Sequence, residues 1–110
     1  MSNEFLLRML PQAELDLDNI YSHITYVLEN PQTAMGLIAK IEKELLNLTF
    51  MPKRYPLSDI SELANAGYRK CIIDDYIALF RIDEKRKLVI VATVFHGMRD
   101  YKNLGSVLSY

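Results

Sequence analysis

Three side chains that can take part in chemistry follow the last apolar run of the sequence, residues 88–95. His96 can exchange protons near neutral pH, Arg99 can hold an anionic group, and Tyr101 carries a phenol that donates a hydrogen bond. A histidine at the end of an apolar strand is also a common structural residue, held by hydrogen bonds. If the protein carries out a reaction, the sequence favours a site near this end of the chain.

The elements that must position these residues begin with a series of predicted strands. Residues 67–101 contain three short apolar runs separated by two clusters of charge. Charged clusters between β-branched and aromatic runs are typical of turns, so we expect a three-stranded antiparallel meander. The third run, residues 88–95, is apolar on both faces and is expected to be a central strand. In the second run, Arg81 lies on the side opposite Tyr76 and Phe80.

Two helices are predicted before the meander. Residues 5–10 form a short apolar run that ends at a proline and suits an edge strand. Apolar residues at helical spacing follow and predict a helix of about five turns. A second apolar stripe begins after Asn30 and Pro31, two residues that suit the start of a helix. The first stripe is Ala13, Leu17, Ile20, Ile24 and Val27, and the second is Ala34, Ile38, Ile41, Leu45 and Leu48. We expect an antiparallel helical hairpin on one face of the sheet, with Lys40 and Glu44 paired on its outer side.

The stretch between the hairpin and the meander, residues 49–66, is expected to be a loop because prolines interrupt it. Within it, Asp59 is expected to cap a short helical turn that Gly67 closes. For Arg69, the structural alternative to a functional role is a pairing with one of the two aspartates in the following turn, a contact of small energetic weight. His23, on the first helix, is expected at a solvated or rim position.

The order of these elements predicts an α+β fold. An N-terminal strand and an antiparallel helical hairpin are expected to pack on a three- to four-stranded, mainly antiparallel sheet. No repeat or linker interrupts the sequence, so we expect one domain over residues 1–110. Its core is expected at about 5–101, followed by a C-terminal tail at 102–110.

Composition narrows the class of protein. Half of the 110 residues are apolar, and the single cysteine, Cys71, excludes a disulfide framework and a thiolate zinc cluster; we expect it to be a packed residue. No cofactor or metal is indicated, and the first residues and apolar runs do not resemble a signal peptide or a membrane span, so a cytoplasmic location is the default. Residues 1–52 carry a net charge of −4 and residues 53–110 a net charge of +3. The second half therefore suits phosphate or an acidic partner, although residues 85–87 alone are typical of a solvated turn.

The order and spacing of several short motifs resemble those of the RelE/ParE superfamily of toxins from bacterial type II toxin–antitoxin modules, over residues 5–101. The motifs are Asp16 and Ile20, Asn30 and Pro31 with Ala34, Ile41 to Leu48 before Met51 and Pro52, Tyr68 to Lys70, Asp75 and Tyr76, Phe80 to Asp83, and His96 to Asp100. The resemblance implies a small toxin that arrests growth and is held inactive by a cognate antitoxin protein. It also implies the strand, hairpin and meander order described above.

The resemblance leaves the target open. Members similar to the ParE branch inhibit DNA gyrase, whereas members similar to the RelE branch cut messenger RNA on the ribosome. The pattern from Arg69 through Tyr76 to Arg81 is closer to the ParE side, and Ile77 stands where nuclease members often carry a basic residue. We therefore expect gyrase inhibition, with a ribosome-dependent mRNA endoribonuclease as the alternative. A non-toxic relative that retains only antitoxin binding is a second alternative.

If the chain is a nuclease, the resemblance implies a metal-independent site formed by Arg69, Arg81, His96, Arg99 and Tyr101. Cleavage of this kind deprotonates the 2′-hydroxyl, protonates the leaving 5′-oxygen and stabilises extra negative charge on phosphorus. In that site His96 or Tyr101 handles protons, and the three arginines hold the phosphate. Whether the protein is an enzyme is open at this point.

Overall fold

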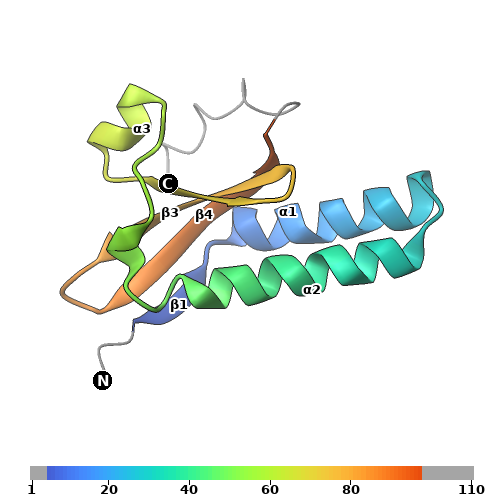
Figure 1. Ribbon diagram of the computed structural model, residues 1–110, viewed down its shortest axis with the longest axis horizontal. Helices are drawn as coiled ribbons and strands as arrows, with labels where there is room; N and C mark the ends of the chain where they lie inside the picture. Colours follow the sequence, from blue (N-terminus) through green and yellow to red (C-terminus); the bar gives the residue numbers. More distant parts are fainter. Residues whose placement is uncertain (1–4, 98–110) are drawn as a thin grey trace.

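The structure is a computed structural model that describes residues 5–97, and it has the predicted α+β architecture (Figure 1). In chain order the elements are β1 (Leu6–Met9), α1 (Pro11–Ser22), the π-helical turn η1 (His23–Val27), α2 (Pro31–Asn47), the 3₁₀ turn η2 (Pro52–Arg54), α3 (Ser61–Asn65), β2 (Arg69–Ile73), β3 (Tyr76–Asp83) and β4 (Leu88–His96). The predicted order of strand, helical hairpin and meander is therefore confirmed.

The sheet has four strands in the order β1-β4-β3-β2. β1 pairs with β4 in parallel, with Leu6 opposite Leu88, and the other two pairings are antiparallel. β4 therefore lies between two strands, and all of its residues except His96 are buried. This position explains why the sequence of β4 is apolar on both faces, because both faces of an inner strand are covered.

The helical hairpin covers one face of the sheet. α2 begins as predicted, because the Asn30 side chain accepts a hydrogen bond of 3.2 Å from the backbone N–H of Thr33 and Pro31 occupies the first turn. The first helix differs from the prediction, since regular α-helix ends at Ser22 and continues as the π-helical turn η1. The larger buried core lies between the hairpin and the sheet. It includes Ala13, Ile41, Leu45, Leu48, Cys71, Ile73, Tyr76, Ala78, Phe80, Val89, Val91 and Val94.

The outer contact of the hairpin also differs from the prediction. Lys40 does not pair with Glu44 on its own helix; its Nζ lies 2.7 Å from Oδ1 of Asp74. Asp74 occupies the tight turn between β2 and β3, where its φ is +54°. A carboxylate held in a turn costs less side-chain entropy to pair than a second long side chain on a helix does. The ion pair therefore joins the hairpin to the sheet.

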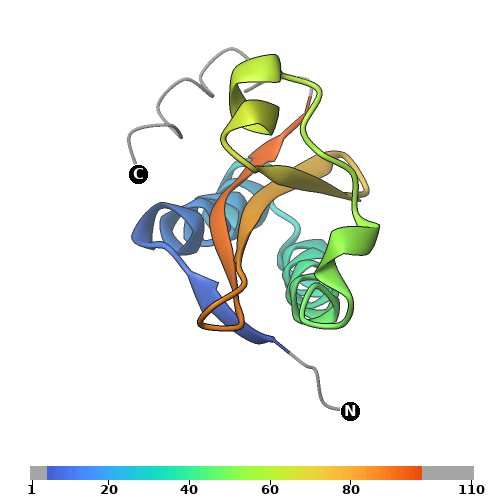
Figure 2. The ribbon, with the colours of Figure 1, turned by 90° about the vertical axis from the view of Figure 1, so that its left-hand side faces the viewer.

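α3 covers the opposite face of the sheet (Figure 2). A second core forms there from Leu63, Tyr68, Leu79, Ala92 and Phe95. The predicted turn exists and ends at Gly67, whose φ of +90° suits glycine.

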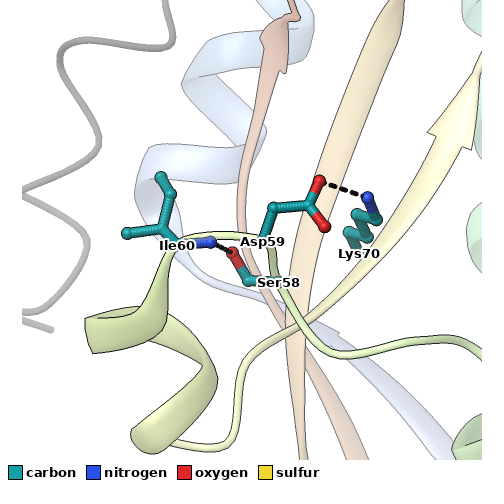
Figure 3. Close-up of polar contacts among 4 residues, drawn as sticks. All are labelled: Ser58, Asp59, Ile60 and Lys70. Atoms are coloured by element: carbon teal, nitrogen blue, oxygen red, sulfur yellow. Dashed lines mark hydrogen bonds and ion pairs between the residues drawn. The ribbon is translucent and has the colours of Figure 1, made fainter.

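The predicted cap of this turn is wrong. Asp59 instead binds Nζ of Lys70 at 2.5 Å, and the hydroxyl of Ser58 accepts a hydrogen bond from the backbone N–H of Ile60 (Figure 3). Lys70 lies on the neighbouring strand β2, so Asp59 joins the loop to the sheet. The spacing suggested that the Asp59 carboxylate caps the helix, but this carboxylate pairs with the cation of Lys70, which is distant in the sequence.

Candidate functional site

Arg69, the first of the predicted site residues, holds a loop in place. Its Nη1 donates a hydrogen bond of 2.7 Å to the carbonyl oxygen of Tyr55, and it lies 3.4 Å from that of Lys53. The alternative pairing of Arg69 with an aspartate in the β2–β3 turn is wrong, because Arg69 starts β2 and the turn follows its last residue, Ile73. The guanidinium therefore orders the loop that contains η2.

Arg81 and His96 lie in different parts of the sheet. Arg69 is paired with Phe80, so adjacent Arg81 projects from the other face of β3, as the alternation predicted. His96 is paired with Tyr76 at the far end of β3. Tyr76 is about 16 Å along the strand from Arg81 at 3.3 Å per residue. These three residues do not converge on one site. Arg99 and Tyr101 lie outside the described residues, so the five-residue nuclease set stays a prediction.

The end of β4 does border a polar cavity of about 320 Å³. It is lined by Asp16, Asn19, Ile20, His23, Tyr76, Val94, Phe95 and His96. The rings of His96 and Tyr76 meet edge to face, with their centroids 5.3 Å apart. Two imidazoles, a carboxylate and an amide thus surround a space large enough for a small ligand.

Asp16 fastens this cavity together. Its Oδ2 accepts a hydrogen bond of 2.5 Å from the hydroxyl of Thr93 and one of 3.0 Å from the backbone N–H of Val94. Its Oδ1 accepts one of 2.7 Å from the side-chain amide of Gln12. Because the first two donors belong to β4, Asp16 fixes α1 on the central strand. Each of these hydrogen bonds is stronger than one between neutral groups, because the acceptor is charged.

His23 is the lining residue that sequence reasoning missed. Its partial burial agrees with the predicted rim position, but its place beside the cavity of His96 was not expected. Asp16, Asn19 and His23 recur at spacings of three and four, which places them on one face of the helix. That polar stripe beside the apolar one was the available signal.

A larger groove lies where α1, α2 and β1 meet. Its volume is about 690 Å³, and its lining residues are Leu7, Met9, Glu14, Leu17, Asp18, Tyr21, Ile38, Glu42, Leu45 and Leu46. The aliphatic side chains come from all three elements, so the surface is mainly apolar. Leu46 is 60% exposed and lies beside the other apolar lining residues, so it adds to a continuous apolar surface.

The rim of the groove is acidic. Glu14 and Asp18 lie one turn apart on α1, and Glu42 faces them from α2. The outer edge of β1 runs beside the groove and carries no further strand within residues 5–97. A groove of this kind fits an amphipathic segment with apolar residues on one side and lysine or arginine beside them.

Cys71 has the chemistry of a packed residue, as predicted. It is only 3% exposed, and burial, with a smaller contribution from the negative charge of Glu44, raises the pKa of its thiol to about 11. Nucleophilic cysteines need the thiolate near neutral pH, so this environment opposes catalysis by Cys71.

The Cys71 thiol should make stability depend on pH in the alkaline range. Its unfolded pKa is 9.0 and its folded pKa is about 11, so the unfolded chain loses this proton first and stability falls as pH rises between these values. We expect denaturant titrations at pH 8 and pH 10.5 to differ by about 1–2 kcal/mol more in the wild type than in Cys71→Ala. Equal pH dependence of the two proteins would contradict the buried thiol.

No three His, Cys, Asp or Glu side chains in the described part of the chain are arranged to hold a metal ion. None of the helices within residues 5–97 is long and apolar enough to cross a membrane.

Comparison with known proteins identifies the family. The family model described as the ParE toxin of the type II toxin–antitoxin system parDE matches residues 7–101. The chain belongs to the ParE toxin family. No curated protein sequence matches it.

Solved structures of ParE and RelE toxins share the fold. A chain of the chromosomal ParDE system from P. aeruginosa has a TM-score of 0.71 and 22% identity, covering 86% of this chain and 98% of that one. A chain of the RelBE complex from Mycobacterium tuberculosis has a TM-score of 0.59 and 22% identity, covering 84% and 91%. A mutant of the E. coli toxin RelE in the free state has a TM-score of 0.62 and 13% identity, covering 96% and 92%. The predicted RelE/ParE resemblance is confirmed, and this ParE-family chain has the toxin fold.

Proposed function

We propose that this chain is a growth-arresting toxin that inhibits DNA gyrase and is neutralised by a cognate antitoxin protein. The observation that carries the proposal is the match of the ParE toxin family model over residues 7–101. The separation of Arg69, Arg81 and His96 supports it, because a toxin that acts by binding needs no convergent catalytic group. The fold alone does not favour either target, since both branches share it.

The groove between α1, α2 and β1 is where we place the antitoxin. The related solved structures include a ParDE toxin–antitoxin system and a RelBE toxin–antitoxin complex, so a protein partner of this kind is known for similar folds. The apolar lining can accept the apolar face of a helix, and the exposed edge of β1 can accept an added strand. Glu14, Asp18 and Glu42 favour an antitoxin segment with basic residues beside its apolar face.

The test of the target uses the full chain on purified gyrase. We expect the chain to inhibit supercoiling of relaxed plasmid, and we expect equimolar antitoxin to restore it. Messenger RNA from cells arrested by the chain should show no new 5′ ends at codon boundaries. Normal supercoiling at a large molar excess of toxin would reject the gyrase proposal.

The nuclease alternative rests on the polar cavity beside His96. His23 and His96 both line it, and RNA cleavage needs groups that exchange protons. New codon-boundary ends that disappear in His96→Ala and Arg99→Ala, with gyrase unaffected, would favour this alternative. If induction of the chain without its antitoxin leaves growth unchanged, the protein is the non-toxic relative instead.

A further inference from the structure

Five cations gather at one end of the sheet, a region we call the basic end: Lys53, Arg54, Lys85, Arg86 and Lys87. All five are exposed. The last three belong to the β3–β4 turn, which lies at the end of the molecule opposite the α1–α2 connection (Figure 1). An ion pair of 2.6 Å between Nζ of Lys53 and Oε2 of Glu84 joins η2 to this turn. Two segments far apart in sequence therefore form one surface.

Several contacts fix the shape of the basic end before any partner binds. Oδ1 of Asp83 accepts a hydrogen bond of 3.1 Å from the backbone N–H of Arg86, which closes the turn. Arg54 donates a hydrogen bond of 3.1 Å to the carbonyl oxygen of Phe50 and one of 3.0 Å to that of Asn47, at the end of α2. Nζ of Lys87 lies 4.9 Å from the ring centroid of Phe5. Ordering that precedes binding lowers the entropy cost of binding.

Charge is separated along the molecule. The basic end has five cations and two carboxylates, Asp83 and Glu84. The hairpin, residues 11–47, has six carboxylates and only Lys40 and Lys43 as cations. A basic run on an isolated turn is usually only solvated. Here the separation of acidic and basic charge between the two ends of the molecule can orient the whole protein in the electric field of a charged partner. A polyanion is repelled by the hairpin and attracted to the basic end.

We propose that the basic end binds the phosphate backbone of duplex DNA. β1 pairs with β4 from Leu88 onwards, so only the β3–β4 turn, residues 84–87, projects beyond the paired strands (Figure 1). A narrow projection of this kind can approach the wide major groove of B-form DNA, whereas the major groove of A-form RNA is too deep and narrow for side chains to read, so the shape favours DNA. This inference goes beyond gyrase inhibition, because it assigns the chain a nucleic-acid contact of its own.

Salt-dependent binding of the purified full chain to a labelled 20-base-pair DNA duplex tests the proposal. In fluorescence anisotropy between 50 and 200 mM salt, we expect K85Q/R86Q to lower affinity about tenfold at the low end. The slope of log K against log salt should flatten by about 1.8, because each lost phosphate contact removes about 0.9. The control K40Q/K70Q removes the same charge elsewhere, from two lysines already paired with Asp74 and Asp59, and should bind like the wild type.

A second variant should act in the opposite direction. E84Q removes the carboxylate that holds Lys53, so we expect tighter DNA binding and a steeper salt slope. Thermal melts of each variant show whether it is folded. The proposal would be overturned if K85Q/R86Q and K40Q/K70Q lost the same affinity for DNA, or if the wild type did not bind DNA at 50 mM salt. Tighter binding to duplex RNA or to anionic lipid vesicles would also overturn it. Since no gyrase is present, failure here leaves the proposed gyrase inhibition standing.

Discussion

Replacing Leu46 by aspartate is expected to weaken antitoxin binding by at least about 100-fold. The side chain lines the α1–α2–β1 groove and is 60% exposed, so a partner in the groove covers it and a carboxylate there must be desolvated. The same carboxylate adds to the acidic rim without a cation beside it. In cells, L46D should stop growth even when the antitoxin is produced with it.

Leu28 provides the matched control. It is also 60% exposed, but it lies after η1 at the far end of the hairpin and does not line the groove. We expect L28D to bind the antitoxin as the wild type does in isothermal titration calorimetry. L28D lies outside regular helix and should change the free energy of unfolding by less than about 0.5 kcal/mol, whereas L46D places a negative charge in the last turn of α2 and should lower it by about 1 kcal/mol. If L46D binds as tightly as L28D, the antitoxin occupies another surface.

Asp16→Ala is expected to lower the free energy of unfolding by about 2–3 kcal/mol. The substitution removes a charged group that accepts three hydrogen bonds. Two of the donors, the Thr93 hydroxyl and the Val94 N–H, lie on buried β4 and would lose this acceptor. Urea denaturation measures the loss. Asp16→Asn keeps one carbonyl oxygen and should lose about half as much.

Asp18→Ala is the control for this prediction. Asp18 is on the same helix, is exposed and belongs to the groove, so its loss should change stability by less than about 0.5 kcal/mol. If D16A is as stable as D18A, the contact of α1 with β4 is not held by this carboxylate. If D16A is less stable and its His96 resonances shift in NMR, the carboxylate also shapes the cavity.

Local chemistry explains what the sequence predicted well. The Asn30 cap, the Gly67 turn and the apolar faces of β3 depend on neighbours within a few residues, so spacing alone reveals them. The apolar character of β4 likewise identified it as an inner strand. These features follow from backbone geometry and side-chain periodicity.

Long-range partners explain what the sequence did not predict. Lys40 forms an ion pair with Asp74, and Asp59 forms one with Lys70. Each partner belongs to another element, whereas the sequence spacing suggested contacts within the helices. His23 lies at the same cavity as His96 because α1 packs on β4, where Asp16 accepts hydrogen bonds from Thr93 and Val94. A charged side chain pairs with whichever partner the folded chain brings close, and single-sequence spacing does not contain that information.

The parallel pairing of β1 with β4 has a consequence for how the protein is made. Leu6 pairs with Leu88, and the hairpin, α3, β2 and β3 all lie between them in the chain. Contacts between such distant residues form late, because a long loop must close first. During translation Leu7 and Met9 have no strand to pack beside until β4 has left the ribosome. The groove therefore comes into existence only after the chain has been synthesised through β4.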